Sequence, residues 1–462
     1  NKGMITVALL FLVSEGIRQS GTLGQVIKKL LPQGKTTVFK AQLRILPSVA
    51  FISAFLNNTP VVVIFAPIIK HWAKSVKLPR QMCIRDSSYV TILGGICTLI
   101  GTSTNLVVHG MILEAGYEGF TMFELGKVGI FIAIAGIIYL FIFSKRLLPD
   151  ARPDTAVPDE EVEEGEKLHR VEAVLGARFP GINKKLSDFN FQRHYGAEVK
   201  EIKTRNGQRY VNHLEDVVLR EGDTLVVMAD DTFIPTWGES SVFVLLTNGN
   251  DPDTSGKKKR WLALILLVLM IVGATVGELP ATKEMFPDIK LDMFFFVCIT
   301  TIIMAWTNIF PARKYTKYIS WDILITIACA FAISKAMVNS GVADCVAGFI
   351  IGLSDDYGPH VLLAILFVIT NLFTELITNN AAAALAFPLA LSISAQLGVS
   401  PTPFFVVICM AASASFSTPI GYQTNLIVQG IGNYKFTDFV RIGLPLNIIT
   451  FLISVILIPL IW

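Results

Sequence analysis

Adjacent asparagine side chains occur at two places where the chain is otherwise apolar. Asn57-Asn58-Thr59 interrupts one apolar stretch, and Thr378-Asn379-Asn380 interrupts another. Amide and hydroxyl oxygens can replace the hydration shell of Na⁺, while N–H groups and helix N-termini can hold an oxyanion without a counter-charge. Asparagine is costly in hydrocarbon, and helix packing rarely needs two such pairs. The pairs therefore favour ion binding.

Two turns rich in glycine and hydroxyl groups accompany these pairs. The two turns have the same length, and each begins with glycine and ends in Thr-Asn: Gly101-Thr-Ser-Thr-Asn105 and Gly421-Tyr-Gln-Thr-Asn425. Glycine lets a backbone carbonyl approach an ion closely. A single Ser or Thr in a membrane helix is explained by a hydrogen bond to its own backbone, so the paired asparagines indicate function more strongly. The candidate residues are Ser53, Asn57, Asn58, Thr59, Thr98, Gly101, Ser103, Thr104 and Asn105, with Thr374, Thr378, Asn379, Asn380, Thr418, Gly421, Thr424 and Asn425.

The composition indicates a chain solvated by lipid. Hydrophobic residues make up 52% of the 462 residues and charged residues only 16%, against about 25% charged in soluble proteins. The net charge of +3 does not suggest nucleic acid as a partner. The six cysteines are scattered, and no nucleophile–base pair, phosphate loop or metal-ligand cluster suggests an enzyme or a cofactor. We predict an all-α polytopic membrane protein.

Ten apolar segments position the polar residues. They cover about 3–19, 43–72, 88–114, 126–148, 260–278, 289–310, 321–338, 361–395, 403–430 and 440–461. The segments 43–72 and 361–395 contain the asparagine pairs and then a proline, and neither half of each is comfortably long enough to span a bilayer. We interpret both as re-entrant hairpins with tips near the middle of the membrane. The segments 88–114 and 403–430 contain the glycine turns and are predicted to be broken helices.

An internal repeat relates the two halves of the membrane part. Gly101–Gly110 recurs as Gly421–Gly430, 320 residues later, and the asparagine pairs recur at nearly the same separation. Counting the first segment and leaving out the hairpin, the chain crosses the membrane five times before it reaches the copy, so the copies are predicted to be inverted, as in many secondary transporters. Basic residues gather in the loops of one predicted side, which puts the region between the halves in the cytoplasm.

A region of different composition separates the halves. We predict a membrane repeat over 1–150, an acidic linker over 151–164, a small soluble α/β domain over 165–248, a basic linker over 249–260 and a second repeat over 261–462. Turn signals at Asn206-Gly207 and Glu221-Gly222-Asp223 separate β-branched runs. The chain starts at Asn1 without methionine, so the first repeat is expected to be N-terminally truncated.

At these residues the chain resembles the divalent anion–sodium symporter family, in the superfamily that also contains arsenite and Na⁺/H⁺ permeases. That family carries Ser-Asn-Thr at each hairpin tip, matched here by Asn57-Asn58-Thr59 and Thr378-Asn379-Asn380 with the central Asn kept. Its Thr-Pro-Pro-Asn turns look like Thr102–Asn105 and Tyr422–Asn425. The resemblance implies Na⁺-coupled symport of sulfate or a di- or tricarboxylate by an elevator motion, in a multi-pass homodimer of the plasma (inner) membrane.

The resemblance also assigns roles by position. One Na⁺ site would use Ser53, Asn57, Asn58 and the Gly101 carbonyl, and the other would use Thr374, Thr378, Asn379 and the Gly421 carbonyl. The anion would be held by Asn58, Thr59, Thr104, Asn105, Asn379, Asn380, Thr424 and Asn425. The alternative is a Na⁺/H⁺ antiporter or an arsenite-type permease, in which Glu375 is the candidate titratable group. A third alternative is a ligand sensor that binds without transporting.

Two further segments carry expectations of their own. Leu219–Val227 resembles the C-terminal lobe of potassium-conductance regulator (TrkA-C-like) domains, which implies regulation by an unknown small ligand. Permeases with such inserts resemble sulfate transporters; they often carry two lobes, and one is found here. Gln81–Ser87 fits no expected helix start and resembles a translated sequencing adapter, so we expect that it is not native sequence.

Overall fold

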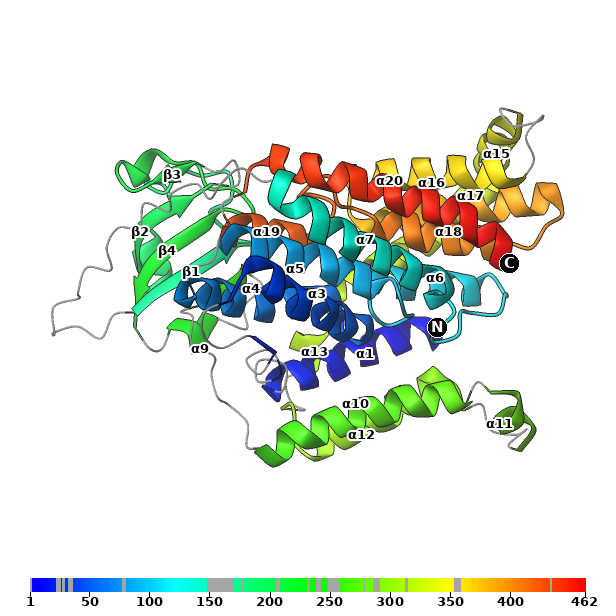
Figure 1. Cartoon of the computed structure of the whole chain (residues 1–462), viewed down its shortest axis with the longest axis horizontal. Helices are drawn as coiled ribbons and strands as arrows, with labels where there is room; N and C mark the ends of the chain where they lie inside the picture. The colour runs from blue at the N-terminus through cyan, green and yellow to red at the C-terminus, as the bar shows by residue number, and fades with distance from the viewer. Residues whose placement is uncertain are drawn as a thin grey trace.

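The computed structural model is mostly helical, with one sheet at one end of the helical body (Figure 1). The structure describes residues 2–21, 26, 30–31, 36–76, 80–147, 169–176, 178–204, 208–230, 233–237, 242–247, 257–277, 279–285, 291–311, 315–352, 359–432 and 434–462. The predicted acidic linker and residues 249–256 of the predicted basic linker lie outside these ranges, as does the predicted turn at Asn206-Gly207. Lys257–Arg260, predicted as linker, instead begin a helix.

The first half of the chain forms helices that stop at the predicted polar interruptions. They are α1 (Lys2–Gln19), α3 (Val38–Phe55), α4 (Asn58–Ser75), α5 (Arg80–Gly95), α6 (Ser103–Glu114) and α7 (Gly126–Leu147). The chain is extended at Leu56, where α3 ends, and again at Thr102, just before α6. The asparagine pair and the first glycine turn therefore both lie at helix breaks.

The second half contains more helices than the first within the described residues. It contains α10 (Lys257–Gly277), α11 (Pro280–Met285), α12 (Met293–Trp306), α13 (Tyr315–Tyr318), α14 (Trp321–Asn339), α15 (Val342–Gly352), α16 (Pro359–Leu376), α17 (Asn379–Leu397), α18 (Thr402–Ser413), α19 (Gln423–Gly432) and α20 (Phe436–Ile461). Thr378 caps α17, because its side-chain oxygen accepts a hydrogen bond from Ala381 N. A polar tip residue thus also starts a helix.

Four described helices are long and apolar enough to cross a membrane. They include Gly126–Ser144, Lys258–Gly277, Asn379–Leu397 and Phe436–Ile461, and α14 with α15 would form a fifth span bent by 72°. The prediction that neither half of the second hairpin reaches spanning length is wrong for α17, whose 19 residues rise about 28 Å. The sequence interpretation underestimated this arm because it placed the second hairpin's end at residue 395 and counted Pro388 as an interruption, whereas Pro388 lies inside the helix.

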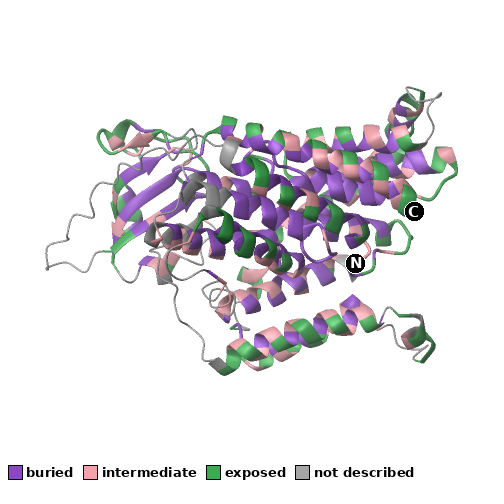
Figure 2. Cartoon of the chain, viewed as in Figure 1, coloured by how far each residue is buried: buried purple, intermediate pink, exposed green. Residues whose placement is uncertain are grey.

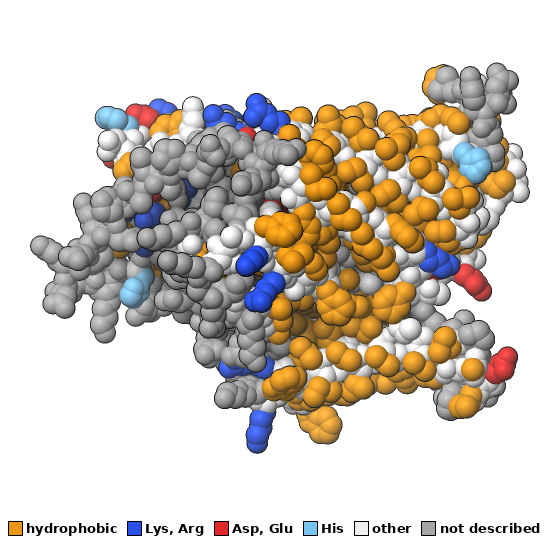
Figure 3. Space-filling model, in the orientation of Figure 1, with side chains coloured by type: hydrophobic (Ala, Val, Ile, Leu, Met, Phe, Trp, Pro, Cys, Tyr) orange, Lys and Arg blue, Asp and Glu red, His pale blue; other side chains and the backbone are white. Residues whose placement is uncertain are grey.

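The outer faces of the long helices are apolar. On α20, Leu444, Ile448, Leu452 and Ile456 are each at least half exposed, whereas Leu446, Thr450 and Ile458 are buried. Exposed and buried residues alternate in this way along the outer helices of Figure 2, and Figure 3 shows a nearly continuous hydrophobic surface over them. Such a surface is suited to lipid.

The helix that follows each glycine turn packs against helices of the opposite half. The helix after the first turn, α6, packs against α17 and α18, and the helix after the second turn, α19, packs against α4 and α5. The pair α10 and α12 packs on α1 and lies apart from the remaining helices (Figure 1). Each hairpin tip is therefore held beside the broken helix of the opposite half.

Between the halves, five strands form an antiparallel sheet in the order β3-β2-β4-β1-β5. The strands are β1 (His169–Leu175), β2 (Glu198–Lys203), β3 (Arg209–Tyr210), β4 (Thr224–Ala229) and β5 (Phe243–Thr247), with the short helices α8 (Phe191–Tyr195), α9 (Phe233–Trp237) and η1 (Leu214–Asp216). Phe179, Tyr195 and Phe243 belong to a core separate from that of the membrane helices.

The turn before β4 touches the membrane part. Gly222 has a φ of 83°, a conformation that favours glycine, and a Cβ there would meet the side chain of Leu426 on α19. Val174 of β1 is fully buried and belongs to the core of the membrane helices, not to that of the sheet. The sheet therefore packs on the helix that follows the second glycine turn.

The segment that resembles an adapter, Gln81–Ser87, lies in the first half of α5. Asp86 and Ser87 are buried, and Asp86 Oδ2 accepts hydrogen bonds from Gln42 Nε2 at 2.7 Å and Ser144 Oγ at 2.6 Å. A sequencing read of the source DNA that returns this segment unchanged would contradict the expectation that it is foreign.

Candidate functional site

The first hairpin tip is buried against its own half and against Tyr422. Asn58 has no exposed surface. In the amide orientation that satisfies all its neighbours, Nδ2 faces Ser53 Oγ at 2.7 Å, Thr91 O at 3.0 Å and Gly101 O at 3.2 Å. The amide oxygen then accepts from the Tyr422 hydroxyl. Three of the residues predicted for one Na⁺ site therefore lie together at the end of α3.

The second hairpin tip contacts the turn of the first half. Asn379 Nδ2 donates to Thr104 Oγ1 at 2.7 Å, and Asn380 Oδ1 accepts from Ser103 and Thr104 at 3.3 Å each. The matching contact of the first tip joins Thr59 Oγ1 to Gln423 Oε1 at 3.4 Å. Each tip is thus hydrogen-bonded to the broken helix of the other half.

The Tyr422 hydroxyl joins the two tips. It lies 2.8 Å from Thr102 Oγ1, is hydrogen-bonded to Asn58 and also interacts with the Asn379 side chain. Asn379 is only 8% exposed. The two central asparagines, more than 300 residues apart in sequence, therefore meet at one buried hydroxyl group.

Corresponding hydrogen bonds shape the two glycine turns. In the first, Thr98 Oγ1 donates to Ala54 O, and Asn105 Nδ2 donates to Thr98 O at 2.9 Å. In the second, Thr418 Oγ1 donates to Glu375 O at 3.0 Å, and Asn425 Nδ2 donates to Thr418 O at 3.3 Å. These bonds tie each turn to the hairpin of its own half.

The glycine of each turn touches hairpin backbone. A Cβ on Gly101 would lie closer than 3.0 Å to Ala54 O and to Gly95. A Cβ on Gly421 would lie closer than 3.0 Å to Thr374 O and Ser415 Oγ. Only glycine allows this approach, so each turn and its hairpin are packed without space for a side chain.

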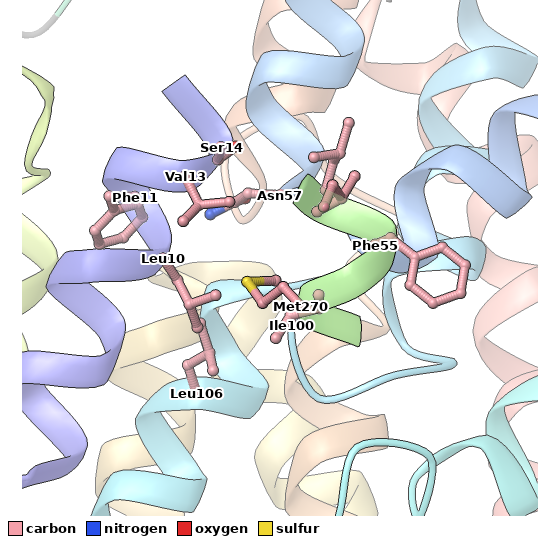
Figure 4. A pocket seen from close by; sticks show the side chains of 11 residues that line it. Leu10, Phe11, Val13, Ser14, Phe55, Asn57, Ile100, Leu106 and Met270 are labelled. Carbon is pink, nitrogen blue, oxygen red and sulfur yellow. The ribbon is translucent and has the colours of Figure 1, made fainter. Parts of the chain in front are cut away.

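Other predicted residues lie at the edge of this cluster. Asn57 lines a separate cavity of about 20 Å³ with Ser14 and Leu106, shown in Figure 4. Thr378 is exposed and caps α17, while Thr374 Oγ1 donates to Ala412 O at 2.6 Å. Asn57 and Thr378 are therefore not brought into the group around Tyr422.

Two buried oxygens of the turns have no hydrogen-bond partner in the described part of the chain. They are Asn105 Oδ1 and Thr424 Oγ1, both on fully buried side chains. The equivalent oxygen of Asn425 accepts from Ser88 Oγ at 2.9 Å. Unpartnered buried oxygens are costly unless a ligand or water satisfies them, so these two are candidate ligand atoms.

The site is built almost entirely from neutral groups. Among the described residues, no group of three or more His, Cys, Asp or Glu could hold a metal ion. Glu375 lies near the end of α16, and its carboxylate Oε1 accepts from Ser417 N at 2.9 Å and from Asn447 Nδ2 at 2.7 Å. Its Oε2 is buried without a hydrogen-bond partner among the described residues. Hydroxyl, amide and carbonyl oxygens without charge suit a weakly bound monovalent cation.

Thr102, Tyr422 and Gln423 are site residues that were missed from the sequence. Tyr422 and Gln423 were quoted only as part of a turn, yet they bond to the first tip. Their positions correspond to Thr102 and Ser103 of the first half, and this correspondence was the available signal.

Replacing Tyr422 by phenylalanine is expected to lower the initial rate of transport by about 10- to 100-fold. The ring would stay, but three buried polar partners would lose the shared hydroxyl, at about 1–3 kcal/mol per group left unsatisfied. Initial uptake into proteoliposomes measures the effect. Tyr117→Phe is the matched control, because Tyr117 is 45% exposed and packs its ring on Phe405 outside the site; equal rates for both variants would exclude the bridging role.

The profile of the citrate transporter family (CitMHS) matches residues 1–398 and 285–462, which together cover the whole chain. The chain belongs to the citrate transporter family. This family member is therefore a membrane transporter, in agreement with its several long apolar helices.

Named relatives of this citrate transporter family member are also transporters. An uncharacterized transporter of Synechocystis sp. is 28% identical over all of this chain and 89% of its own length. Sodium/sulfate cotransporter 2 of Chlamydomonas reinhardtii is 30% identical over 61% of this chain and 31% of its own length. The sodium-dependent dicarboxylate transporter SdcS of Staphylococcus saprophyticus is 25% identical over 31% of this chain and 28% of its own length.

Proposed function

We propose that the protein is a Na⁺-coupled symporter of a small anion, either sulfate or a di- or tricarboxylate. The observation that carries the proposal is the meeting of Asn58 and Asn379 at the Tyr422 hydroxyl, away from solvent. Burying polar tips inside an apolar body is unfavourable unless they bind a ligand. Secondary transporters bind substrate and coupling ions where their membrane helices are interrupted in this way.

Four helix N-termini at this cluster favour an anion. Helices α4, α6, α17 and α19 begin at Asn58, Ser103, Asn379 and Gln423, and all have ten or more residues. Each N-terminus is equivalent to roughly +0.5 elementary charge, so four would offset roughly two negative charges. That value matches a dianion such as sulfate without requiring any basic side chain.

The coupling ions would lie on the outer sides of the anion. One Na⁺ site would use Ser53, Asn58 and the Gly101 carbonyl. Ser53 Oγ and Gly101 O lie within 3.2 Å of Asn58 Nδ2, and in the other amide orientation Asn58 Oδ1 lies 2.7 Å from Ser53 Oγ, so the bound ion would require the amide to turn its oxygen toward this place. The other would use Thr374, Asn379 and the Gly421 carbonyl at the corresponding place. Asn57 and Thr378 would contribute through their backbone, because their side chains lie elsewhere.

An inverted repeat moving by an elevator mechanism accounts for the matched contacts. Thr59 with Gln423 and Asn380 with Ser103 are equivalent pairs in the two halves, as are the bonds of Thr98 and Thr418. The positive-inside rule supports a cytoplasmic sheet domain. That this domain is TrkA-C-like and binds a small regulatory ligand, and that the protein is an inner-membrane homodimer, are proposed from the sequence resemblance alone. The relatives named for sulfate and dicarboxylate support these two anion classes.

Uptake of labelled anions into proteoliposomes tests the proposal. Sulfate, succinate, citrate and arsenite would each be offered with an inward Na⁺ gradient, with K⁺ replacing Na⁺, and with a pH gradient alone. We expect one dianion or trianion to accumulate only with Na⁺. Uptake driven equally well by the pH gradient, or arsenite movement without Na⁺, would exclude Na⁺-coupled anion symport.

The unpartnered oxygen of Glu375 favours proton coupling as a second candidate. Glu375→Gln keeps the side-chain shape and the acceptor for Ser417 N and Asn447. Under Na⁺ symport, we expect this variant to keep its Na⁺ dependence and the pH profile of the unmodified protein between pH 5.5 and 8.5. A variant that transports but no longer responds to a pH gradient, while the exposed-residue control Glu118→Gln does respond, would favour the proton-coupled alternative.

A further inference from the structure

An apolar groove of about 660 Å³ lies between α3 and α10 and extends to Leu56, next to the first hairpin tip. Its walls are Pro47, Phe51 and Phe55 on α3 and Leu264, Val268 and Val272 on α10. Phe51 is 70% exposed and Val268 and Val272 are each about half exposed. The groove is therefore open to the surroundings of the helices along much of its length.

The described protein does not close this groove. Helix α10 packs on α12 and α1, and α3 packs on α4, α5 and α7, but α3 and α10 are not a packed pair within the described chain. Figure 3 shows hydrophobic side chains on both sides of the gap between the α10–α12 pair and the helices next to it. In a bilayer such a gap would be filled by apolar chains.

Basic side chains lie one turn before the start of both walls. Arg44, whose carbonyl accepts from Ser48 Oγ at 2.8 Å, precedes the α3 wall, and Arg260 precedes Leu264 on α10. Lys40 and Lys258 are exposed on the same two helices. In Figure 3, Lys and Arg side chains gather where the apolar surface ends, on the side nearer the sheet. The groove thus joins a basic end to an apolar interior.

We propose that the groove binds an anionic glycerophospholipid of the bilayer, with its phosphate at Lys40, Arg44 and Arg260 and an acyl chain between Phe51 and Val268. Basic pockets between membrane helices are suited to anionic head groups. A second copy of this chain is less suited, since it would bring an identical basic end against this one. The chain end would reach Phe55 and Leu56, which also line the cavity beside Asn57, so the lipid would support the first hairpin tip.

Native mass spectrometry of the purified full-length chain tests the proposal with two added lipids of the same acyl chains. Palmitoyl-oleoyl phosphatidylglycerol is the anionic probe and palmitoyl-oleoyl phosphatidylcholine the uncharged comparison. We expect the unmodified protein to retain phosphatidylglycerol at least about 5-fold more than phosphatidylcholine. Val268→Trp, which fills the groove, should remove this retention, whereas Leu269→Trp should not, because Leu269 is 59% exposed on the same helix and does not line the groove.

A charge variant separates head-group recognition from packing. Arg44→Gln alters an exposed side chain, so it tests the proposal even where Val268→Trp does not fold. We expect it to reduce the preference for phosphatidylglycerol at least 3-fold while leaving phosphatidylcholine retention unchanged. Equal retention of the two lipids by the unmodified protein would overturn the proposal. A Val268→Trp variant that keeps its preference for phosphatidylglycerol but no longer forms dimers would also overturn the proposal, because a second copy of the chain would then be what fills the groove.

Discussion

Replacing either Asn58 or Asn379 by alanine is expected to lower Na⁺-dependent anion uptake by at least about 100-fold. Asn58 faces three oxygens of its own half and the Tyr422 hydroxyl, and Asn379 donates to Thr104 across the halves. Both amides would serve a Na⁺ site and the anion at once. A 100-fold loss corresponds to about 2.7 kcal/mol, close to the cost of leaving two buried polar groups without partners.

The control for these two variants is Asn339→Ala. Asn339 is exposed at the end of α14 and takes part in none of the hydrogen bonds described for either tip, so its variant should transport at the unmodified rate. Initial rates are to be normalised to the amount of folded protein in the liposomes, measured by gel filtration. If Asn58→Ala or Asn379→Ala retained half of the unmodified rate, the paired tips would not form the transport site.

Adding one methyl group at Gly421 is expected to weaken the binding of Na⁺ during transport. The new Cβ would lie within 3.0 Å of Thr374 O, a backbone atom that cannot rotate away. The hairpin and the turn would have to separate, at a cost of about 1–3 kcal/mol for an overpacked core. Because the Gly421 carbonyl is a proposed Na⁺ ligand, this separation would raise the Na⁺ concentration needed for half-maximal uptake at least about 10-fold. Gly101→Ala should act in the same way at the first turn.

Gly110→Ala distinguishes this packing effect from a general intolerance of alanine. A Cβ on Gly110 of α6 would meet nothing within 4 Å, so this variant should keep the unmodified Na⁺ dependence. The measurement is uptake as a function of Na⁺ concentration for Gly421→Ala and Gly110→Ala. Identical Na⁺ curves for the two would contradict a Na⁺ site at the Gly421 carbonyl.

The helix breaks could be predicted from sequence because their residues contradict their surroundings. Asn57-Asn58 and Thr378-Asn379 are polar within apolar runs, and helices α4 and α17 do begin at the central Asn of each tip. Gly101 and Gly421 likewise lie in non-helical turns before α6 and α19. These are local properties of the chain, so a single sequence carries them.

Features made by distant segments could not be read in this way. The contact of Tyr422 with both tips depends on how two halves pack, and a tyrosine in an apolar run looks like an ordinary membrane residue. The 72° bend between α14 and α15 and the groove between α3 and α10 depend on tertiary packing that periodicity does not encode. The spanning length of α17 was missed because proline is tolerated inside membrane helices, where neighbours satisfy the freed carbonyl.

The most direct test of Na⁺ coupling at the paired tips is Na⁺ flux driven by the anion alone. Proteoliposomes with equal Na⁺ on both sides would receive an inward gradient of the anion selected by the uptake panel, and entry of ²²Na⁺ would be measured. Because coupling is reciprocal, the account predicts net ²²Na⁺ accumulation in the unmodified protein and none in Asn58→Ala or Asn379→Ala. Anion entry without any net ²²Na⁺ movement in the unmodified protein would contradict it.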